Sequence, residues 1–192
     1  MNQEDRVYSV LIVSSSRNFQ EIVDAHFPES IFNPLHTVNS ISAAKRKSSE
    51  YTYDLVVINS PLPDDVGVRF AIDTAPESAV MLIVSNEIYE DVNYRVSPHG
   101  VFVLAKPFSK TFFATAVSWL RSAREIIKRS QKKTHTIEEK MEEIRIVNRA
   151  KWLLINERKM EEPEAHRYIE KQAMDRCISK GDVAREIIDM YS

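Results

Sequence analysis

The chain contains one cysteine, three glycines and no long apolar run, and each scarcity excludes a class of protein. A single cysteine, Cys177, cannot form an internal disulfide or a multi-cysteine metal site, which agrees with a reducing compartment, so we expect it to pack between helices. Three glycines cannot supply a Walker loop or a GxGxxG motif. Because no run reaches about 18 apolar residues and acids precede the first one, we expect no membrane span and no signal peptide, and we predict a cytoplasmic protein.

Catalytic and metal-binding patterns are also lacking. The five histidines are scattered along the chain without the spacing of metal ligands. No set of nucleophile, base and oxyanion donor can be assembled from the remaining residues. We therefore predict that the protein is not an enzyme and binds neither a metal nor a cofactor. The histidines are His26, His36, His99, His135 and His166.

Charge is distributed unevenly along the 192 residues, a length that allows one domain and a smaller module. Residues 1–120 carry 9 Lys and Arg against 14 Asp and Glu, whereas residues 121–192 carry 17 against 14. A basic C-terminal part favours a polyanion partner there. On charge alone, a solvated helix surface is the favoured interpretation of the same residues.

Five short apolar runs, mostly rich in β-branched residues, alternate with stretches of helical spacing in the first 105 residues. Strands that alternate with helices imply parallel β-α units with helices on both faces of the sheet. The sequence therefore predicts an α/β fold with a doubly wound, five-stranded parallel sheet of flavodoxin-like type. The expected strands are 7–13, 31–38, 54–58, 79–84 and 100–105.

After Pro107 the pattern changes, because neither proline nor glycine occurs again before Pro163. Apolar residues at heptad spacing predict one long helix, and a coiled coil that forms a homodimer. The polar stretch 128–136 weakens the seam, so a flexible linker between two helices is the alternative. The apolar positions are Phe113, Ala116, Leu120, Ala123, Ile127, Ile137, Met141 and Ile144.

The last fifty residues divide at two helix-start signals into a small all-α bundle. Pro163 is suited to the first turn of a helix, and Ser179 followed by Asp182 resembles a capping box. Together with the end of the long helix, three helices result. We expect Ala165, Tyr168, Ile169, Ala173 and Met174 on one apolar face of the middle helix. The predicted domains are 1–122, the linking helix 112–148 and the bundle 137–192.

Polar residues follow the strands at the edge of the sheet where parallel strands end. Strand one ends "VLIVSSS", strand three "VVINSPLPDD", strand four "LIVSN" and strand five "LAKPFS". This layout resembles the receiver domain of bacterial response regulators over about residues 5–120. In that family an acid pair after strand one and an aspartate after strand three bind Mg²⁺, and that aspartate accepts phosphate.

The resemblance breaks at the residues that carry the chemistry. Ser14 and Ser15 stand at the acid-pair positions, and Asn59 stands at the phospho-acceptor position, so metal ligands and nucleophile are missing together. Ser85 and Lys106 remain at the switch positions; we expect Lys106 to bond the Asn59 oxygen or to point at solvent. The domain is similar to a pseudo-receiver, independent of phosphorylation and controlled by a partner protein or ligand.

Near that edge, Asp64 and Asp65 lie in the loop after the third strand. We expect them to belong to a solvated turn rather than to replace the missing phospho-acceptor.

The C-terminal stretch "RAKWLLINERKMEEPEAHRYIEKQAMDRCISKGDVAREII" resembles the ANTAR domain, an RNA-binding module of transcription antitermination regulators. "AK" followed by "LL", then "EAHRYIEKQAM", Arg176 and "VA" carry the resemblance, whereas Trp152 stands where the family usually has a small residue. The resemblance implies binding to RNA stem-loops. Lys151 and Arg176 match family positions and are the first candidates for RNA contact; Arg149, Lys171 and Lys180 are the second.

These features predict an antitermination regulator that binds stem-loops in nascent leader RNA as a homodimer. A protein-interaction adaptor is one alternative. A DNA-binding helix-turn-helix protein is another, although the final helix "DVAREIIDMY" carries only Arg185 as a basic residue.

Overall fold

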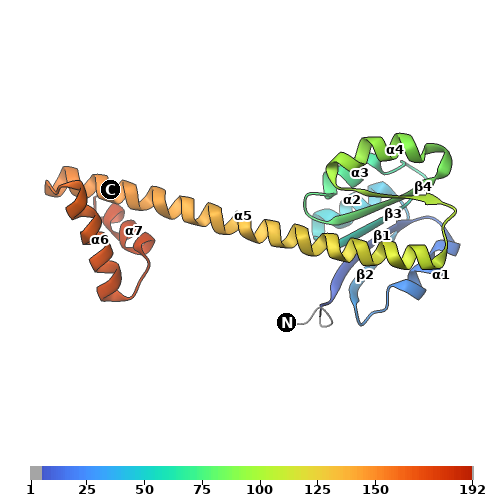
Figure 1. Ribbon diagram of the computed structural model, residues 1–192, viewed down its shortest axis with the longest axis horizontal. Coiled ribbons are helices and arrows are strands. Elements are labelled where there is room, and N and C mark those ends of the chain that lie inside the picture. Colours follow the sequence, from blue (N-terminus) through green and yellow to red (C-terminus); the bar gives the residue numbers. More distant parts are fainter. Residues whose placement is uncertain (1–5, 192) are drawn as a thin grey trace. The chain divides into compact units, whose positions relative to one another are not determined.

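The computed structural model describes residues 6–191, which divide into two compact units, one ending at Arg129 and one beginning at Ser130 (Figure 1). The first unit contains the predicted five-stranded parallel sheet, with strand order β2-β1-β3-β4-β5. The prediction of a doubly wound sheet is confirmed. The strands are β1 (Tyr8–Ser14), β2 (Phe32–Val38), β3 (Leu55–Asn59), β4 (Ala79–Ser85) and β5 (Phe102–Lys106).

Two apolar layers enclose this sheet, one on each face. Strands β1, β3 and nearly all of β4 are buried on both sides, which is why each contains a continuous apolar run, such as residues 10–13 in β1. Alternate residues of β1 supply different layers: Leu11 and Val13 lie in one core cluster, and Val10 and Ile12 lie in the other. The covering helices are α1 (Arg17–His26), α2 (Ile41–Glu50), α3 (Val68–Thr74) and α4 (Tyr89–Val96), with short 3₁₀ turns η2 (Asn86–Ile88) and η3 (Ser97–His99).

A single helix, α5 (Lys110–Arg158), runs for 49 residues, as the sequence predicts. The first half of its expected coiled-coil seam is a wrong prediction. Phe113, Ala116 and Leu120 are buried against the protein's own sheet, and Ala123 and Ile127 pack on the same cluster. Over so few turns the 3.5-residue seam and the 3.6-residue face of a core helix select almost the same positions.

Other apolar residues are exposed along α5. In the first unit Phe112, Trp119 and Ile126 recur every seven residues on its exposed surface. The Phe112 and Trp119 rings meet edge to face with centroids 6.0 Å apart. In the second unit the predicted seam residues are exposed, so a dimer through them stays a prediction; they are Ile137, Met141 and Ile144.

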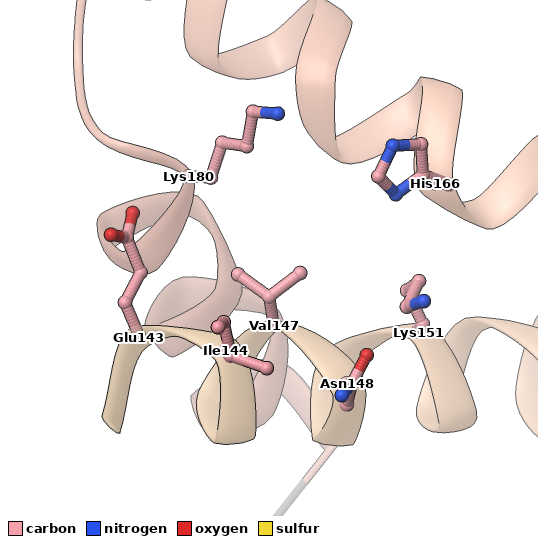
Figure 2. Close-up of a pocket in the computed structure, with 7 residues that line it drawn as sticks. All are labelled: Glu143, Ile144, Val147, Asn148, Lys151, His166 and Lys180. Atoms are coloured by element: carbon pink, nitrogen blue, oxygen red, sulfur yellow. The ribbon is translucent and has the colours of Figure 1, made fainter. Parts of the chain in front are cut away.

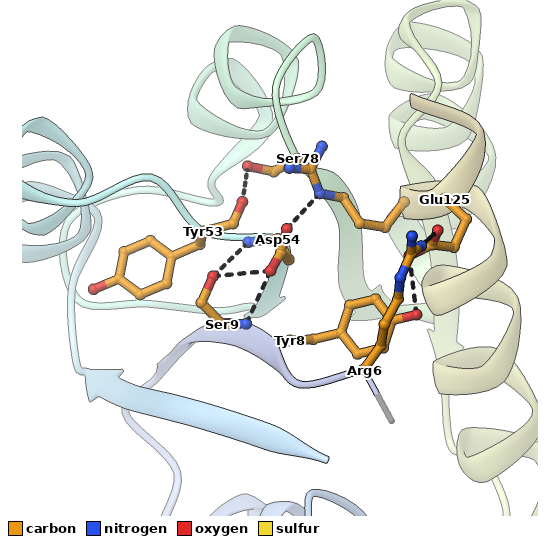
Figure 3. Close-up of polar contacts among 8 residues, drawn as sticks. Arg6, Tyr8, Ser9, Tyr53, Asp54, Ser78 and Glu125 are labelled. Atoms are coloured by element: carbon orange, nitrogen blue, oxygen red, sulfur yellow. Dashed lines mark hydrogen bonds and ion pairs between the residues drawn. The ribbon is translucent and has the colours of Figure 1, made fainter. Parts of the chain in front are cut away.

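An ion pair joins α5 to the amino ends of the strands in the first unit (Figure 3). Arg124 Nε donates to Asp54 Oδ1 at 2.7 Å, and Asp54 Oδ2 accepts from the Ser9 amide and hydroxyl at 3.1 and 3.2 Å. Burial by itself would raise the pKa of Asp54, but the hydrogen bonds from Arg124 and Ser9 and the Arg124 charge hold that pKa below its ordinary value.

A second buried acid on α5 lies beside this pair. Tyr8 donates its hydroxyl to Glu125 Oε1 at 3.1 Å, and Arg6 forms an ion pair with the same carboxylate. Because Arg124 and Glu125 are adjacent and both buried, two charged contacts fix the rotation of α5 on the sheet.

The second unit is the predicted three-helix bundle of the end of α5, α6 (Glu162–Arg176) and α7 (Lys180–Tyr191). Both helix-start signals are confirmed: Pro163 lies in the first turn of α6, and Ser179 Oγ accepts the Asp182 amide at 3.0 Å. Two packing predictions are wrong. Met174 is 79% exposed, and Cys177 is exposed as the left-handed residue that ends α6. The core consists of Ala150, Leu154, Ala165, Ile169, Ala173, Val183, Ala184 and Ile187.

No helix within residues 6–191 is both long enough and apolar enough to cross a membrane.

Candidate nucleic-acid interface and degenerate phosphorylation site

At the carboxyl ends of the strands, Asn59 lies beside Ser14 in the sheet register. The Asn59 side chain is buried, with 3% of the residue exposed, and its Nδ2 donates to Ser14 Oγ at 2.9 Å. Its Oδ1 is also buried and accepts no hydrogen bond from any residue that the structure describes. Ser15 is exposed. The predicted acid-pair and acceptor positions therefore form a neutral, internally bonded pair.

Lys106 follows neither of the two expectations. Its Nζ donates to the Ser60 carbonyl at 2.5 Å, so it neither bonds the Asn59 oxygen nor points freely at solvent. Burial lowers the pKa of Lys106. Ser85 is half-buried and pairs with Lys106 in the register of β4 and β5, and the Lys106–Pro107 peptide is cis. The ammonium group of Lys106 therefore bonds a backbone carbonyl and is not free to bond an anion.

The two acids in the following loop have structural partners. Asp64 accepts from the Ile41 amide at 3.0 Å and the Ser42 amide at 2.9 Å, which caps the start of α2. The Ser42 and Ile41 hydrogen bonds lower the pKa of Asp64 to about 2. Asp65 Oδ1 accepts from the amide of Gly67, a residue at φ +94°. Both acids are exposed, which agrees with a solvated turn, and Asp64 in addition anchors the start of α2.

Mg²⁺ prefers several oxygen ligands that include carboxylates. The neutral Ser14 and Asn59 side chains do not fit that requirement, and within residues 6–191 no cluster of His, Cys, Asp or Glu could hold a metal ion. At this edge of the sheet, Ser14 and Asn59 therefore supply no carboxylate ligand for Mg²⁺.

The second unit carries a groove of about 430 Å³ between α5, α6 and α7 (Figure 2). Helix α5 supplies five lining residues along one side, α6 supplies one and the first residue of α7 supplies one. Two of the five predicted RNA contacts, Lys151 and Lys180, come together here, and the other lining residues are not among those five. The lining residues are Glu143, Ile144, Val147, Asn148, Lys151, His166 and Lys180.

Both groove lysines are paired within the chain. Lys151 Nζ lies 2.8 Å from Glu162 Oε1, and Lys180 Nζ lies 2.5 Å from Glu170 Oε1. His166 Nε2 lies 3.3 Å from the same Glu170 oxygen. Hydrogen bonds from the lysines lower the pKa values of Glu162 and Glu170. An anion that enters the groove must therefore compete with two carboxylates.

The other predicted contacts lie outside the groove lining. Arg176 holds Glu186 with two hydrogen bonds of 2.5 and 2.6 Å. Arg149 and Lys171 are exposed, and neither forms an ion pair with another residue in the part of the chain from 6 to 191. These two cations are available to phosphate without a competing acid.

The second unit coincides with a known family. Residues 135–188 match the ANTAR domain. The transcriptional regulatory protein PdtaR of Mycobacterium tuberculosis is 28% identical over 138 residues, which cover 71% of this chain and 67% of that protein.

Solved structures match the first unit. A signal receiver domain from Pseudomonas fluorescens Pf-5 has a TM-score of 0.56 at 17% identity, covering 69% of this chain and 96% of that one. The chemotaxis response regulator CheY4 of Vibrio cholerae has a TM-score of 0.51 at 15% identity, covering 59% and 98%. At these sequence identities, the matches establish that the first unit has the receiver fold but do not establish its function.

Proposed function

We propose that this chain, a response-regulator-like protein with a receiver-fold domain followed by an ANTAR domain, is an antitermination regulator that binds stem-loops in nascent leader RNA. One observation carries the proposal: the groove that contains Lys151 and Lys180 lies wholly inside the ANTAR-matching stretch. Lysines that neutralise phosphates release condensed counterions, which favours binding and makes it depend on salt. A bound stem-loop is held in the form that prevents a terminator from forming.

Control of this binding does not use phosphate on the receiver fold. The neutral pair of Asn59 and Ser14 offers no nucleophile and no carboxylate for a metal, and Lys106 is held by the Ser60 carbonyl. A partner protein or a ligand supplies the signal instead. The exposed Phe112 and Trp119 rings on α5 give a protein partner apolar surface to contact, and they favour the adaptor as the second candidate function.

RNA binding by the full chain at several salt concentrations tests the proposal. We expect hairpin RNA to bind more tightly than duplex DNA, with an affinity that falls as salt rises. Lys151→Gln should weaken binding about three- to tenfold and reduce the salt slope by about one. Arg176→Gln, Arg149→Gln and Lys171→Gln test the remaining contacts, and Arg69→Gln, an exposed residue of α3, should have no effect. Equal binding to hairpin RNA and duplex DNA would contradict the proposal.

The internal ion pairs allow a second test in the same assay, with a variant that should raise RNA affinity instead of lowering it. Glu170→Gln removes the carboxylate that holds Lys180 and faces His166, so RNA affinity should rise about two- to fivefold at low salt. A fall in affinity would show that Glu170 positions Lys180 for RNA rather than competing for it.

A further inference from the structure

We propose that the groove receives one unpaired RNA base and that Asn148 reads the edge of that base. The inference rests on the RNA-binding function proposed above and adds base specificity to it. The volume of about 430 Å³ falls in the range of clefts that hold small molecules and is too small for a duplex. Sequence-specific RNA recognition usually engages unpaired bases of loops, bulges and ends.

The α5 side of the groove combines an apolar surface with one directional polar group. Ile144 lies three residues before Val147 and four before Asn148, and Lys151 lies four and three residues after them, so all four share one face of the helix. Ile144 is 60% exposed and lies outside the apolar core of the bundle. An apolar surface left open beside polar groups matches a nucleobase, which has an apolar face and a polar edge.

Asn148 is the residue that can distinguish one base from another. Its side chain is exposed, and its amide forms no hydrogen bond with another residue between 6 and 191. An amide presents a donor and an acceptor side by side, so it can form two hydrogen bonds to a base edge in one orientation. The groove lysines carry charge without this directionality.

The remaining lining suits the rest of a nucleotide. Figure 2 shows His166 on α6 across the groove from Asn148 and Lys151, and Lys180 on the same far side. A histidine ring provides a plane for base stacking, and the two lysines provide charge for the adjoining phosphates. Glu143 is the one acid among the seven lining residues, but Glu162 and Glu170 pair with the two groove lysines, so the adjoining phosphates must displace these carboxylates.

A pool of hairpin RNAs with a randomised loop tests the inference. After selection on the full wild-type chain, one loop position should show a strong base preference. Asn148→Leu keeps the side chain's shape but removes its hydrogen bonds, and should reduce the preference at that position about tenfold or more. Arg149→Gln is the matched control: it changes the neighbouring exposed residue outside the groove lining, and should weaken binding to all selected RNAs while leaving the base preference intact.

The outcomes separate the two proposals. If wild type binds the pool but Asn148→Leu keeps the same base preference, the inference is overturned and the RNA-binding function stands. If wild type binds no hairpin, the function itself fails. Light scattering on the same variants measures their oligomeric state. If Asn148→Leu changes the oligomeric state but not the base preference, this face contacts a second copy of the chain and the inference is overturned.

Discussion

The Asn59 nitrogen donates to Ser14, whereas its buried oxygen accepts no hydrogen bond from residues 6–191, and Lys106 donates to the Ser60 carbonyl. These contacts define the surroundings of a carboxylate introduced at position 59. A carboxylate introduced at position 59 would lie beside the neutral Ser14, and neither Ser14 nor Ser15 supplies a second acid to complete a Mg²⁺ site. The lysine alone cannot replace the metal, because it is already engaged with Ser60.

We therefore predict that Asn59→Asp does not restore phosphorylation. Incubation with acetyl phosphate and Mg²⁺, followed by intact-mass measurement, should show no acyl phosphate on this variant. The triple change Ser14→Asp, Ser15→Asp and Asn59→Asp supplies the missing ligands and serves as the comparison. Robust acyl phosphate on the single variant would mean that the serines are not what prevents phosphorylation.

Helix α5 shows best where sequence reasoning succeeds and where it fails. The strands were predictable because burial on both faces leaves an uninterrupted apolar run, as in β1 and β3. The length of α5 was predictable from the absence of proline and glycine. The surface that Phe113 and Leu120 contact was not, since their spacing fits a partner helix as well as the protein's own sheet.

The candidate site was only partly predictable, because the sequence does not show which acid pairs with each lysine. Lys151 and Lys180 were identified as basic residues, but their acids, Glu162 and Glu170, are fixed only by how α6 and α7 pack. Asn148 carries no motif, and its importance follows only from its place in the groove.

The attachment of α5 to the sheet should depend on pH through Asp54. At neutral pH, Arg124→Met leaves a mostly buried carboxylate without its cation, and we expect a loss of about 2–3 kcal/mol in the free energy of unfolding. Because the pKa of Asp54 is lowered in the folded state, the ion pair's contribution is complete above the unfolded pKa of about 3.9. It disappears as the pH falls through the folded pKa.

Urea unfolding at neutral and acidic pH measures this difference. Trp119 fluorescence in a Trp152→Phe background reports on the first unit. Arg69→Met, which breaks the exposed pair with Asp73, is the control and should change stability by less than about 0.5 kcal/mol. A gap between wild type and Arg124→Met that stayed constant into acid would assign the loss to packing instead of charge.

We expect assembly of the protein into a dimer to depend on apolar residues that the structure leaves exposed. Ile137 and Met141 lie on α5 in the second unit, and a seam through them would place two RNA-binding bundles in one dimer. Two linked sites raise affinity for an RNA with two hairpins, because the second binding event becomes intramolecular. The homodimer should therefore bind a two-hairpin RNA at least tenfold more tightly than a single hairpin.

The double change Ile137→Lys and Met141→Glu should produce a monomer, because it places charges in the middle of the proposed seam. Sedimentation should show the smaller species, and the advantage of the two-hairpin RNA should disappear while affinity for one hairpin is kept. Met190→Glu, at an exposed apolar residue of α7, is the matched control and should remain dimeric. A double variant that still dimerises would move the interface to the other exposed stripe on α5, at Phe112, Trp119 and Ile126.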